Sequence, residues 1–120
     1  MEDKSIKLLF ICSRNKWRSL TAEKVFQGIY DYEVRSAGTE NQARVKVTSG
    51  HIGWADLIFV MEKKHVRRLQ ERFGDILFQK KIVCLNIPDD YQFMDDELIE
   101  ILIASVSQHI ELPIDFDGEK

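Results

Sequence analysis

A cysteine, an arginine and a serine stand close together in the stretch FICSRNKWRS, residues 10–19. Cys12 ends an apolar run, and Arg18 and Ser19 follow a polar loop at the point where a helical pattern begins. A loop that leads into a helix N-terminus presents backbone N–H groups to an anion, and an arginine there can bind two oxygens of a phosphate at once. Such surroundings favour the thiolate form of a cysteine, which is its nucleophilic form. The stretch therefore predicts an anion site with a cysteine nucleophile.

The alternative for Cys12 is a structural role. A free cysteine at the end of a core strand is most often a small apolar core residue. The full pattern of Cys, five residues, Arg and Ser is rarer, and average composition would produce it by accident in about 1 chain in 100. Its position between an apolar run and a helical pattern makes coincidence rarer still. We therefore take Cys12 and Arg18 as functional residues.

Strands and helices are predicted to alternate along the chain. Apolar runs predict strands at 6–12, 32–38, 55–61 and 81–86. A helix starting at Ser19 has its apolar face formed by Ala22, Val25, Phe26, Ile29 and Tyr30. Further helices are expected over 48–54, over 62–73 with Gly74 as its stop, and over 95–111.

This alternation predicts an α/β fold, a small doubly wound sheet of four parallel strands with helices on both faces. We expect residues 1–120 to form a single domain. Ligands of such sheets bind beyond the carboxyl ends of the strands. The loop 13–18 leaves the first strand there, and the loop 86–91 leaves the fourth. The two stretches that carry suggestive chemistry are therefore predicted to meet on one rim.

Composition and charge exclude several other classes of protein. Net charge is −3, so no global excess of positive charge points to nucleic acid as a partner. Two cysteines are too few for a disulfide framework and fit a reducing compartment. The first residues, MEDKSIKLLFIC, hold too short an apolar run for a signal peptide or a membrane span. We expect a cytoplasmic protein that does not bind membranes.

The loop resembles the phosphate-binding loop of the low-molecular-weight protein tyrosine phosphatases, whose usual pattern is Cys-x-Gly-Asn-x-Cys-Arg-Ser-Pro. Cys12, Asn15, Arg18 and Ser19 match this pattern. The resemblance extends to the stretch SAGT at 36–39 and to ADLIFVM at 55–61, in the family's order. The family fold, a doubly wound sheet of four parallel strands, agrees with the alternation described above.

The resemblance implies hydrolysis of phosphate monoesters, with phosphotyrosine in proteins or a small aryl phosphate as substrate. Cys12 would attack phosphorus and form a phosphocysteine, while Arg18 would bind the phosphoryl oxygens. Asn15 would hold the loop's shape and Ser19 would stabilise the thiolate. A phosphate or sulfate ion would bind in the loop, and neither an organic cofactor nor a metal is implied. The implied phosphate-binding residues are Ser13, Arg14, Asn15, Lys16, Trp17, Arg18 and Ser19.

The family's general acid is an aspartate in the loop after the fourth strand. Asp89 follows Pro88 in that loop and is the first choice. Asp90 is the second choice, and Asp95 and Asp96 are remote third choices. Acidic residues after a proline are also ordinary turn residues, so a structural role for Asp89 stays open.

Three loop residues depart from the family pattern. Arg14 stands in place of glycine, and the loop would be strained or reshaped if that position needs a positive φ. Trp17 replaces a second cysteine and Leu20 replaces a proline. A large ring at position 17 could pack against a substrate or block one.

Two other functions remain open. A non-catalytic module that binds phosphate or a phosphopeptide would explain Arg14 and Trp17, but it would not need Cys12. A thiol-linked arsenate reductase would need a further cysteine, and Cys84 in the fourth strand is predicted to be buried. The basic run of Lys63, Lys64, His65, Arg67 and Arg68 is taken as a solvated helix face. None of the three histidines, His51, His65 and His109, has the spacing of a metal ligand.

Overall fold

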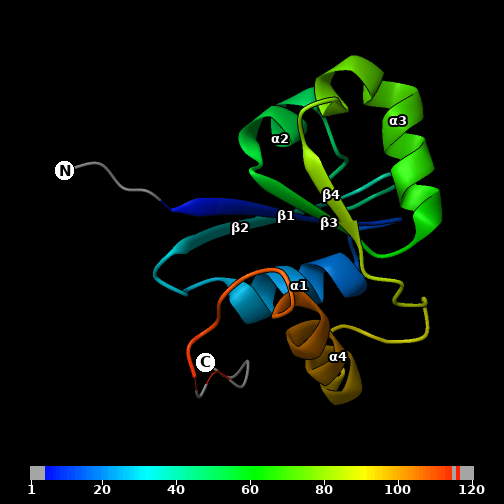
Figure 1. The fold of residues 1–120 in the computed structure, drawn as a ribbon. Coiled ribbons are helices and arrows are strands. Elements are labelled where there is room, and N and C mark those ends of the chain that lie inside the picture. Colours follow the sequence, from blue (N-terminus) through cyan, green and yellow to red (C-terminus); the bar gives the residue numbers. More distant parts are fainter. Residues whose placement is uncertain (1–4, 115, 117–120) are drawn as a thin grey trace.

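The computed structural model describes residues 5–114 and 116, and its centre is a four-stranded parallel sheet with strand order β2-β1-β3-β4 (Figure 1). The strands are β1 (Ile6–Cys12), β2 (Tyr32–Gly38), β3 (Leu57–Val60) and β4 (Lys81–Cys84). The helices are α1 (Arg18–Phe26), α2 (Ser49–Trp54), α3 (Lys63–Leu77) and α4 (Asp96–Val106). The predicted α/β sheet of four parallel strands is confirmed.

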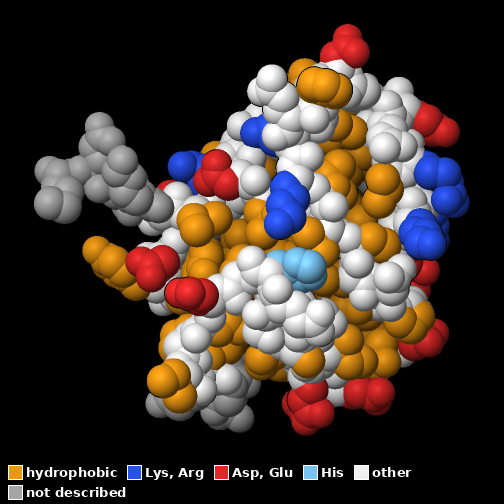
Figure 2. Space-filling view, in the orientation of Figure 1, with side chains coloured by type: hydrophobic (Ala, Val, Ile, Leu, Met, Phe, Trp, Pro, Cys, Tyr) orange, Lys and Arg blue, Asp and Glu red, His pale blue; other side chains and the backbone are white. Residues whose placement is uncertain are grey.

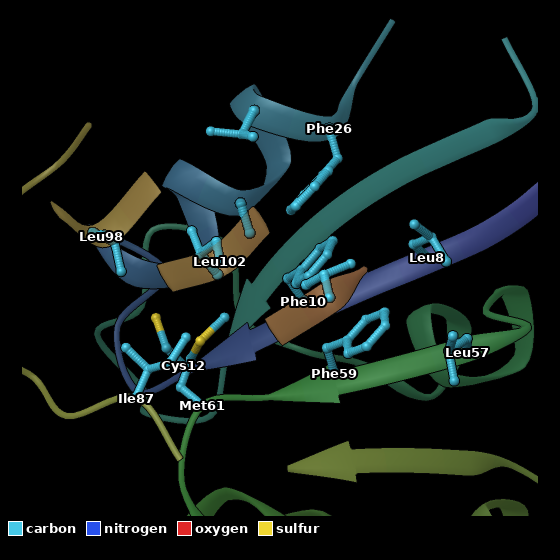
Figure 3. Close-up of a cluster of buried hydrophobic side chains, with 13 residues drawn as sticks. Leu8, Phe10, Cys12, Phe26, Leu57, Phe59, Met61, Ile87, Leu98 and Leu102 are labelled. Carbon is cyan, nitrogen blue, oxygen red and sulfur yellow. The ribbon is translucent and has the colours of Figure 1, made fainter. Parts of the chain in front are cut away.

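Helices cover both faces of the sheet, with α1 and α4 on one side and α2 and α3 on the other (Figure 1). Successive side chains of a strand point to opposite faces, so a central strand must be apolar on both. In β1, Leu8, Phe10 and Cys12 join the cluster under α1 and α4 (Figure 3), whereas Leu9 and Ile11 join the cluster under α2 and α3. This is why the sequence of β1 is continuously apolar from Leu8 to Cys12.

Aromatic rings fill the layer between the sheet and α1. The Phe10 ring stacks on Phe26 and on Phe59, with ring centroids 5.6 and 5.0 Å apart. All three rings are fully buried. On this face of the sheet, the strand that carries Cys12 is therefore packed against α1 and β3 only two residues before the cysteine.

Several predicted element ends are wrong. The first helix stops at Phe26, because Gly28 turns the chain with a φ of 90°, and Tyr30 is 92% exposed instead of lying on an apolar face. The third helix continues past Gly74 to Leu77, whose side chain is buried in the core. The last helix ends at Val106, earlier than predicted. Burial of Leu77 in the core, which a local pattern does not contain, thus extends the third helix, whereas the turn at Gly28 ends the first.

The carboxyl ends of the strands meet at one rim. Cys12 at the end of β1 lies opposite Gly38 at the end of β2. The order of strands reverses at β1, since β2 lies on one side of it and β3 on the other. Ligands of doubly wound sheets bind at such a switch point. None of the helices formed by the described residues has the length and apolar character needed to cross a membrane.

Candidate active site

A pocket of about 290 Å³ opens at this rim, between the β1–α1 loop and the loop after β4. Its lining comes from four segments that are far apart in the sequence. The lining residues are Cys12, Ser13, Arg14, Lys16, Trp17, Arg18, Glu40, Lys64 and Asp89. The two loops that the sequence placed on one rim therefore meet in one cavity.

The sulfur of Cys12 is held at the inner end of the loop, and the residue is 3% exposed. Its Sγ lies 3.0 Å from Ser19 Oγ. Asn15 Nδ2 donates one hydrogen bond to Ser19 Oγ and another to Ser36 Oγ, each 2.8 Å long. Since Ser19 accepts from Asn15, its own hydroxyl hydrogen can be donated either to a thiolate at Cys12, 3.0 Å away, or to the carbonyl oxygen of Ala37, 3.5 Å away. This network can stabilise the sulfur as an anion and as a leaving group.

The loop turns at Asn15, whose φ is 56°. Asparagine is one of the few residues other than glycine that adopt this left-handed conformation readily. Arg14, in contrast, is not among the residues with a positive φ. The strain that a side chain at position 14 could have caused is therefore absent, because the left-handed residue is the next one.

Arg18 is 2% exposed, and its guanidinium is held from one side. Nη1 donates to Glu62 Oε1 at 3.0 Å and to the carbonyl oxygen of Ile87 at 2.9 Å. These two bonds use both hydrogens of Nη1 and leave the donors of Nε and Nη2 for an anion. That edge of a guanidinium can bind two oxygens of a phosphate, so Arg18 is preoriented for a phosphoryl group.

The charge of Arg18 also acts on Glu62. Partial burial would raise the pKa of Glu62, but the hydrogen bond and the positive charge of Arg18 lower it below its ordinary value. Glu62 is therefore a carboxylate in neutral solution and keeps Arg18 in place. A buried arginine without such a partner would be costly.

Asp89 lines the pocket, and its Oδ1 lies 3.6 Å from Nε of Arg18. Asp89 thus faces the Nε edge of Arg18, which donates no hydrogen bond within the described residues. Asp89 is 57% exposed, so its carboxyl group can move toward a bound phosphate ester. Asp90 is not among the lining residues. Of the two candidate acids, Asp89 is therefore the one that lines the pocket beside Arg18.

Solved structures share this architecture at low sequence identity. SP-PTP, a low molecular weight protein tyrosine phosphatase from Streptococcus pyogenes, matches with a TM-score of 0.68 and 17% identity, over 88% of this chain and 94% of that chain. A YwlE mutant from Bacillus subtilis matches with 0.66 and 23%, over 87% and 98%. Vibrio vulnificus Wzb in complex with benzylphosphonate matches with 0.65 and 24%, over 86% and 94%. The chain has the low-molecular-weight phosphatase fold. No protein-family model and no curated protein matches its sequence.

Within this phosphatase fold, the seven candidate phosphate-binding residues divide into two groups. Ser13, Arg14, Lys16, Trp17 and Arg18 line the pocket. Asn15 and Ser19 are fully buried and do not line it. Their side chains instead support the loop from behind, so any contact they make with an anion comes from their backbone. Trp17 is 37% exposed and stands at the pocket wall, where it leaves the cavity open.

Gly38 lets the loop approach β2. A Cβ atom there would lie 2.6 Å from the carbonyl oxygen of Ser13 and 2.9 Å from the carbonyl carbon of Arg14. Both atoms belong to the loop backbone, which cannot give way without moving the pocket. In the sequence, the stretch SAGT was noted only for its resemblance to the phosphatase family. The structure shows that its glycine is required by packing against the loop.

His65 is fully buried, and its ring is hydrogen-bonded to the side chain of Ser13. Its Nδ1 accepts a hydrogen bond from the Glu62 N–H at 3.0 Å. The neutral ring then carries its hydrogen on Nε2 and donates it to Ser13 Oγ, 3.0 Å away. Ser13 keeps its own hydroxyl hydrogen for another acceptor in the pocket. The expectation that the basic run around residue 65 is a solvated face is thus wrong for His65.

The stability of the protein should depend on pH through His65. Burial, followed by the positive charge of Arg18, lowers the pKa of His65 from 6.5 to about 4. Because the unfolded chain binds this proton more readily, the free energy of unfolding falls as pH drops through 6.5 and stops falling below about 4. We expect a loss from this group of about 3 kcal/mol between pH 7 and pH 4.

Urea unfolding of the wild type and of His65→Gln at several pH values measures this effect. The difference in free energy of unfolding between the two should shrink by about that amount on acidification. A His109→Gln variant controls for the loss of a histidine elsewhere. A constant difference between wild type and His65→Gln from pH 7 to pH 4 would show that His65 is not held neutral.

Cys84 was predicted to be buried but is only partly so, and its Sγ donates to Asn86 Oδ1 at 3.3 Å. It pairs with Val60, which in turn lies opposite Ile11 in β1. Cys84 is therefore two strands away from β1, a separation of about 10 Å. A disulfide needs Cα atoms within about 7 Å. Cys84 cannot bond to Cys12 without a backbone rearrangement, which disfavours the arsenate reductase chemistry.

Proposed function

We propose that the protein hydrolyses phosphate monoesters through a phosphocysteine on Cys12. The observation that carries the proposal is the convergence of three groups in one pocket: a buried sulfur beside a serine hydroxyl, the free edge of Arg18, and the carboxyl group of Asp89. A module that only binds phosphate would need Arg18 but would have no use for a cysteine and an acid in the same cavity.

In the first step the thiolate sulfur of Cys12 forms a bond to phosphorus, and the bond from phosphorus to the ester oxygen breaks. Asp89, protonated, gives its proton to the departing oxygen. Arg18 binds two of the phosphoryl oxygens, on which charge gathers in the transition state. The products of this step are the free alcohol and a phosphocysteine.

The second step transfers the phosphoryl group to water. Asp89, now a carboxylate, takes a proton from the water as its oxygen attacks phosphorus. The bond from phosphorus to sulfur breaks, and inorganic phosphate leaves. Ser19 donates its hydrogen bond to the sulfur as negative charge returns to it. The enzyme ends in its starting state, and neither step needs a further reactant.

Aryl phosphates, phosphotyrosine above all, are the proposed substrate class. Because Cys12 is 3% exposed, the phosphoryl group must reach inward from the pocket mouth. A rigid aryl ring holds its phosphate further from a peptide backbone than a serine side chain does. The exposed face of Trp17 at the pocket wall offers a surface for that ring. YwlE is named an arginine phosphatase, so phosphoarginine is the substrate class to test against phosphotyrosine.

Hydrolysis of para-nitrophenyl phosphate in the presence of EDTA, from pH 5 to pH 8, tests the proposal. Release of phosphate by the wild type supports it. A folded protein that binds vanadate but releases no phosphate from para-nitrophenyl phosphate, phosphotyrosine or phosphoarginine would overturn it. That outcome would leave the non-catalytic binding module.

The identity of the acid is tested with Asp89→Asn and Asp90→Asn. We expect Asp89→Asn to lower kcat for phenyl phosphate by about 100-fold or more, because its leaving group needs a proton. The loss should be smaller with para-nitrophenyl phosphate, whose leaving group needs less help. Asp90→Asn, one residue away and outside the pocket lining, is the matched control and should retain the wild-type rate. A larger loss in Asp90→Asn than in Asp89→Asn would reverse the assignment.

A further inference from the structure

A second recess adjoins the pocket and is lined by Arg14, Lys16, Gln42 and Arg44. Arg14 and Lys16 line both cavities, so the two share a wall. When the phosphate of a bound molecule lies next to Cys12, the part of that molecule that extends out of the pocket toward the recess would therefore lie beside these two cations. The mechanism proposed above makes no use of Gln42 or Arg44.

The segment after β2 is tied to the phosphate-binding loop by backbone hydrogen bonds. The N–H groups of Thr39, Glu40 and Arg44 donate to the carbonyl oxygens of Cys12, Ser13 and Arg14, at 3.0, 2.9 and 2.9 Å respectively. Arg44 also donates from Nε to the carbonyl oxygen of Asn15, at 3.3 Å. The backbone at residue 44 thus has a fixed place relative to the loop, and the outer nitrogens of its guanidinium remain available as donors.

The recess carries positive charge that its own lining does not balance. Three of its four lining residues are cations, and the fourth, Gln42, is neutral. Glu40, which lines the neighbouring pocket, is 3.4 Å from Nε of Arg14 and 3.8 Å from Nη1 of Arg68. Among the described residues, no carboxylate lies within ion-pair distance of Lys16 or Arg44. On the face that Figure 2 shows, by contrast, basic and acidic side chains both lie over α3, and further acidic side chains lie around α4.

A concave surface lined by three cations, of which only Arg14 is paired with a carboxylate among the described residues, attracts anions, and arginine donors bind carboxylate and phosphate oxygens best. We propose that this recess binds a second anionic group of the substrate. The preferred substrate would then be a phosphate monoester with a carboxylate or a second phosphate near the phosphate that is removed. The proposal rests on the proposed function, since it assumes that the first phosphate occupies the pocket at Cys12.

Binding to a Cys12→Ser variant tests the recess without depending on turnover. Calorimetry with phosphotyrosine peptides whose neighbouring residues are Glu or Gln gives the preference for a second anion. We expect the Glu peptide to bind about tenfold more tightly at low salt, and the preference to weaken at high salt. Phenyl phosphate with and without a ring carboxylate, used in the same way, shows whether a small molecule supplies the second anion as well as a peptide does.

Arg44→Gln in the same background removes one cation of the recess and none of the pocket. We expect it to reduce the tenfold preference to about threefold or less. The preference is the ratio of the two peptides' affinities, so an equal effect on both peptides from losing the bond between Arg44 Nε and the Asn15 carbonyl cancels. Arg44→Lys, which keeps the charge, should retain most of the preference. Equal binding of the two peptides, or a preference that survives Arg44→Gln, would overturn the proposal.

The two proposals fail in different ways. If the wild type hydrolyses para-nitrophenyl phosphate but the Cys12→Ser variant binds both peptides equally, the recess has no role and the proposed function stands. If the preference depends on Arg44 but no phosphate ester is hydrolysed, the recess stands and the proposed function fails.

Discussion

Replacing Cys12 with serine should reduce kcat for para-nitrophenyl phosphate by about 10⁴-fold or more. A serine hydroxyl is not ionised at neutral pH, and the groups around this position are arranged for a thiolate. Ser19, 3.0 Å away, can donate a hydrogen bond to an anion but offers no strong base to remove a proton from a serine. The variant should fold, because serine is nearly as small as cysteine.

Rates of phosphate release and circular dichroism of both proteins measure this effect. Cys84→Ser is the matched control, since it changes the other cysteine of the chain and should leave the rate unchanged. A Cys12→Ser variant that keeps a tenth or more of the wild-type rate would exclude Cys12 as the nucleophile. A loss in Cys84→Ser as large as that in Cys12→Ser would point instead to a reaction that uses both thiols.

Replacing Arg18 with lysine should lower kcat/KM by about 10³-fold. A lysine keeps the charge but cannot offer two parallel N–H groups to a phosphoryl group. The Glu62 carboxylate, 3.0 Å from Nη1 in the wild type, would also draw a shorter ammonium away from the pocket. The variant therefore loses the oriented donors while a positive charge still faces Glu62.

Steady-state kinetics measure the loss of catalysis in Arg18→Lys. The dissociation constant for vanadate measures the loss of binding to the phosphoryl site. We expect vanadate binding to weaken together with kcat/KM, because vanadate occupies the place of the transferring phosphoryl group. Arg68→Lys serves as the control, since Arg68 lies near the pocket and pairs with Glu40 but does not line the cavity. If Arg18→Lys keeps kcat/KM within a few-fold of the wild type, Arg18 contributes charge and no oriented hydrogen bonds.

Much of the fold could be predicted because its signals are local. The strand β1 is a nearly continuous apolar run, interrupted only by Lys7, and its predicted bounds are those of the structure. Strands alternating with helices force a parallel sheet, and a parallel sheet brings the carboxyl ends of its strands to one rim. This is how Cys12 and Asp89, 77 positions apart in the sequence, could be expected in one place before any coordinates were known.

The supporting contacts of the site could not be predicted, because they join residues that have no sequence relation. The partner of Arg18 is Glu62, 44 positions along the chain, and the partner of Ser13 is His65, 52 positions along. His65 sits in a run of basic residues that resembles an exposed helix face. Only the packing of α3 against the loop distinguishes it from its neighbours. A Glu-x-x-His pair at the start of a helix, where Glu62 N–H meets His65 Nδ1, is the one local signal that could have pointed to it.

Backbone conformation is the second part that the sequence did not resolve. Arg14 replaces a glycine of the resembling family, and position 14 was therefore the expected place for strain. The structure places the left-handed residue at Asn15 instead, where the φ is 56° and two serines hold the side chain. Asparagine can adopt a left-handed φ and donate both of these hydrogen bonds. The residue type alone does not show that position 15, and not position 14, has this conformation.

Trapping the covalent intermediate tests the central claim most directly. The wild type is mixed with excess para-nitrophenyl phosphate, quenched within milliseconds, digested, and examined by mass spectrometry for a phosphoryl group on the peptide that contains Cys12. We expect that peptide to carry one phosphoryl group, and Cys12→Ser to yield no thiophosphate. Steady turnover with no phosphoryl group on Cys12, or with the group on another residue, would contradict nucleophilic catalysis by this cysteine.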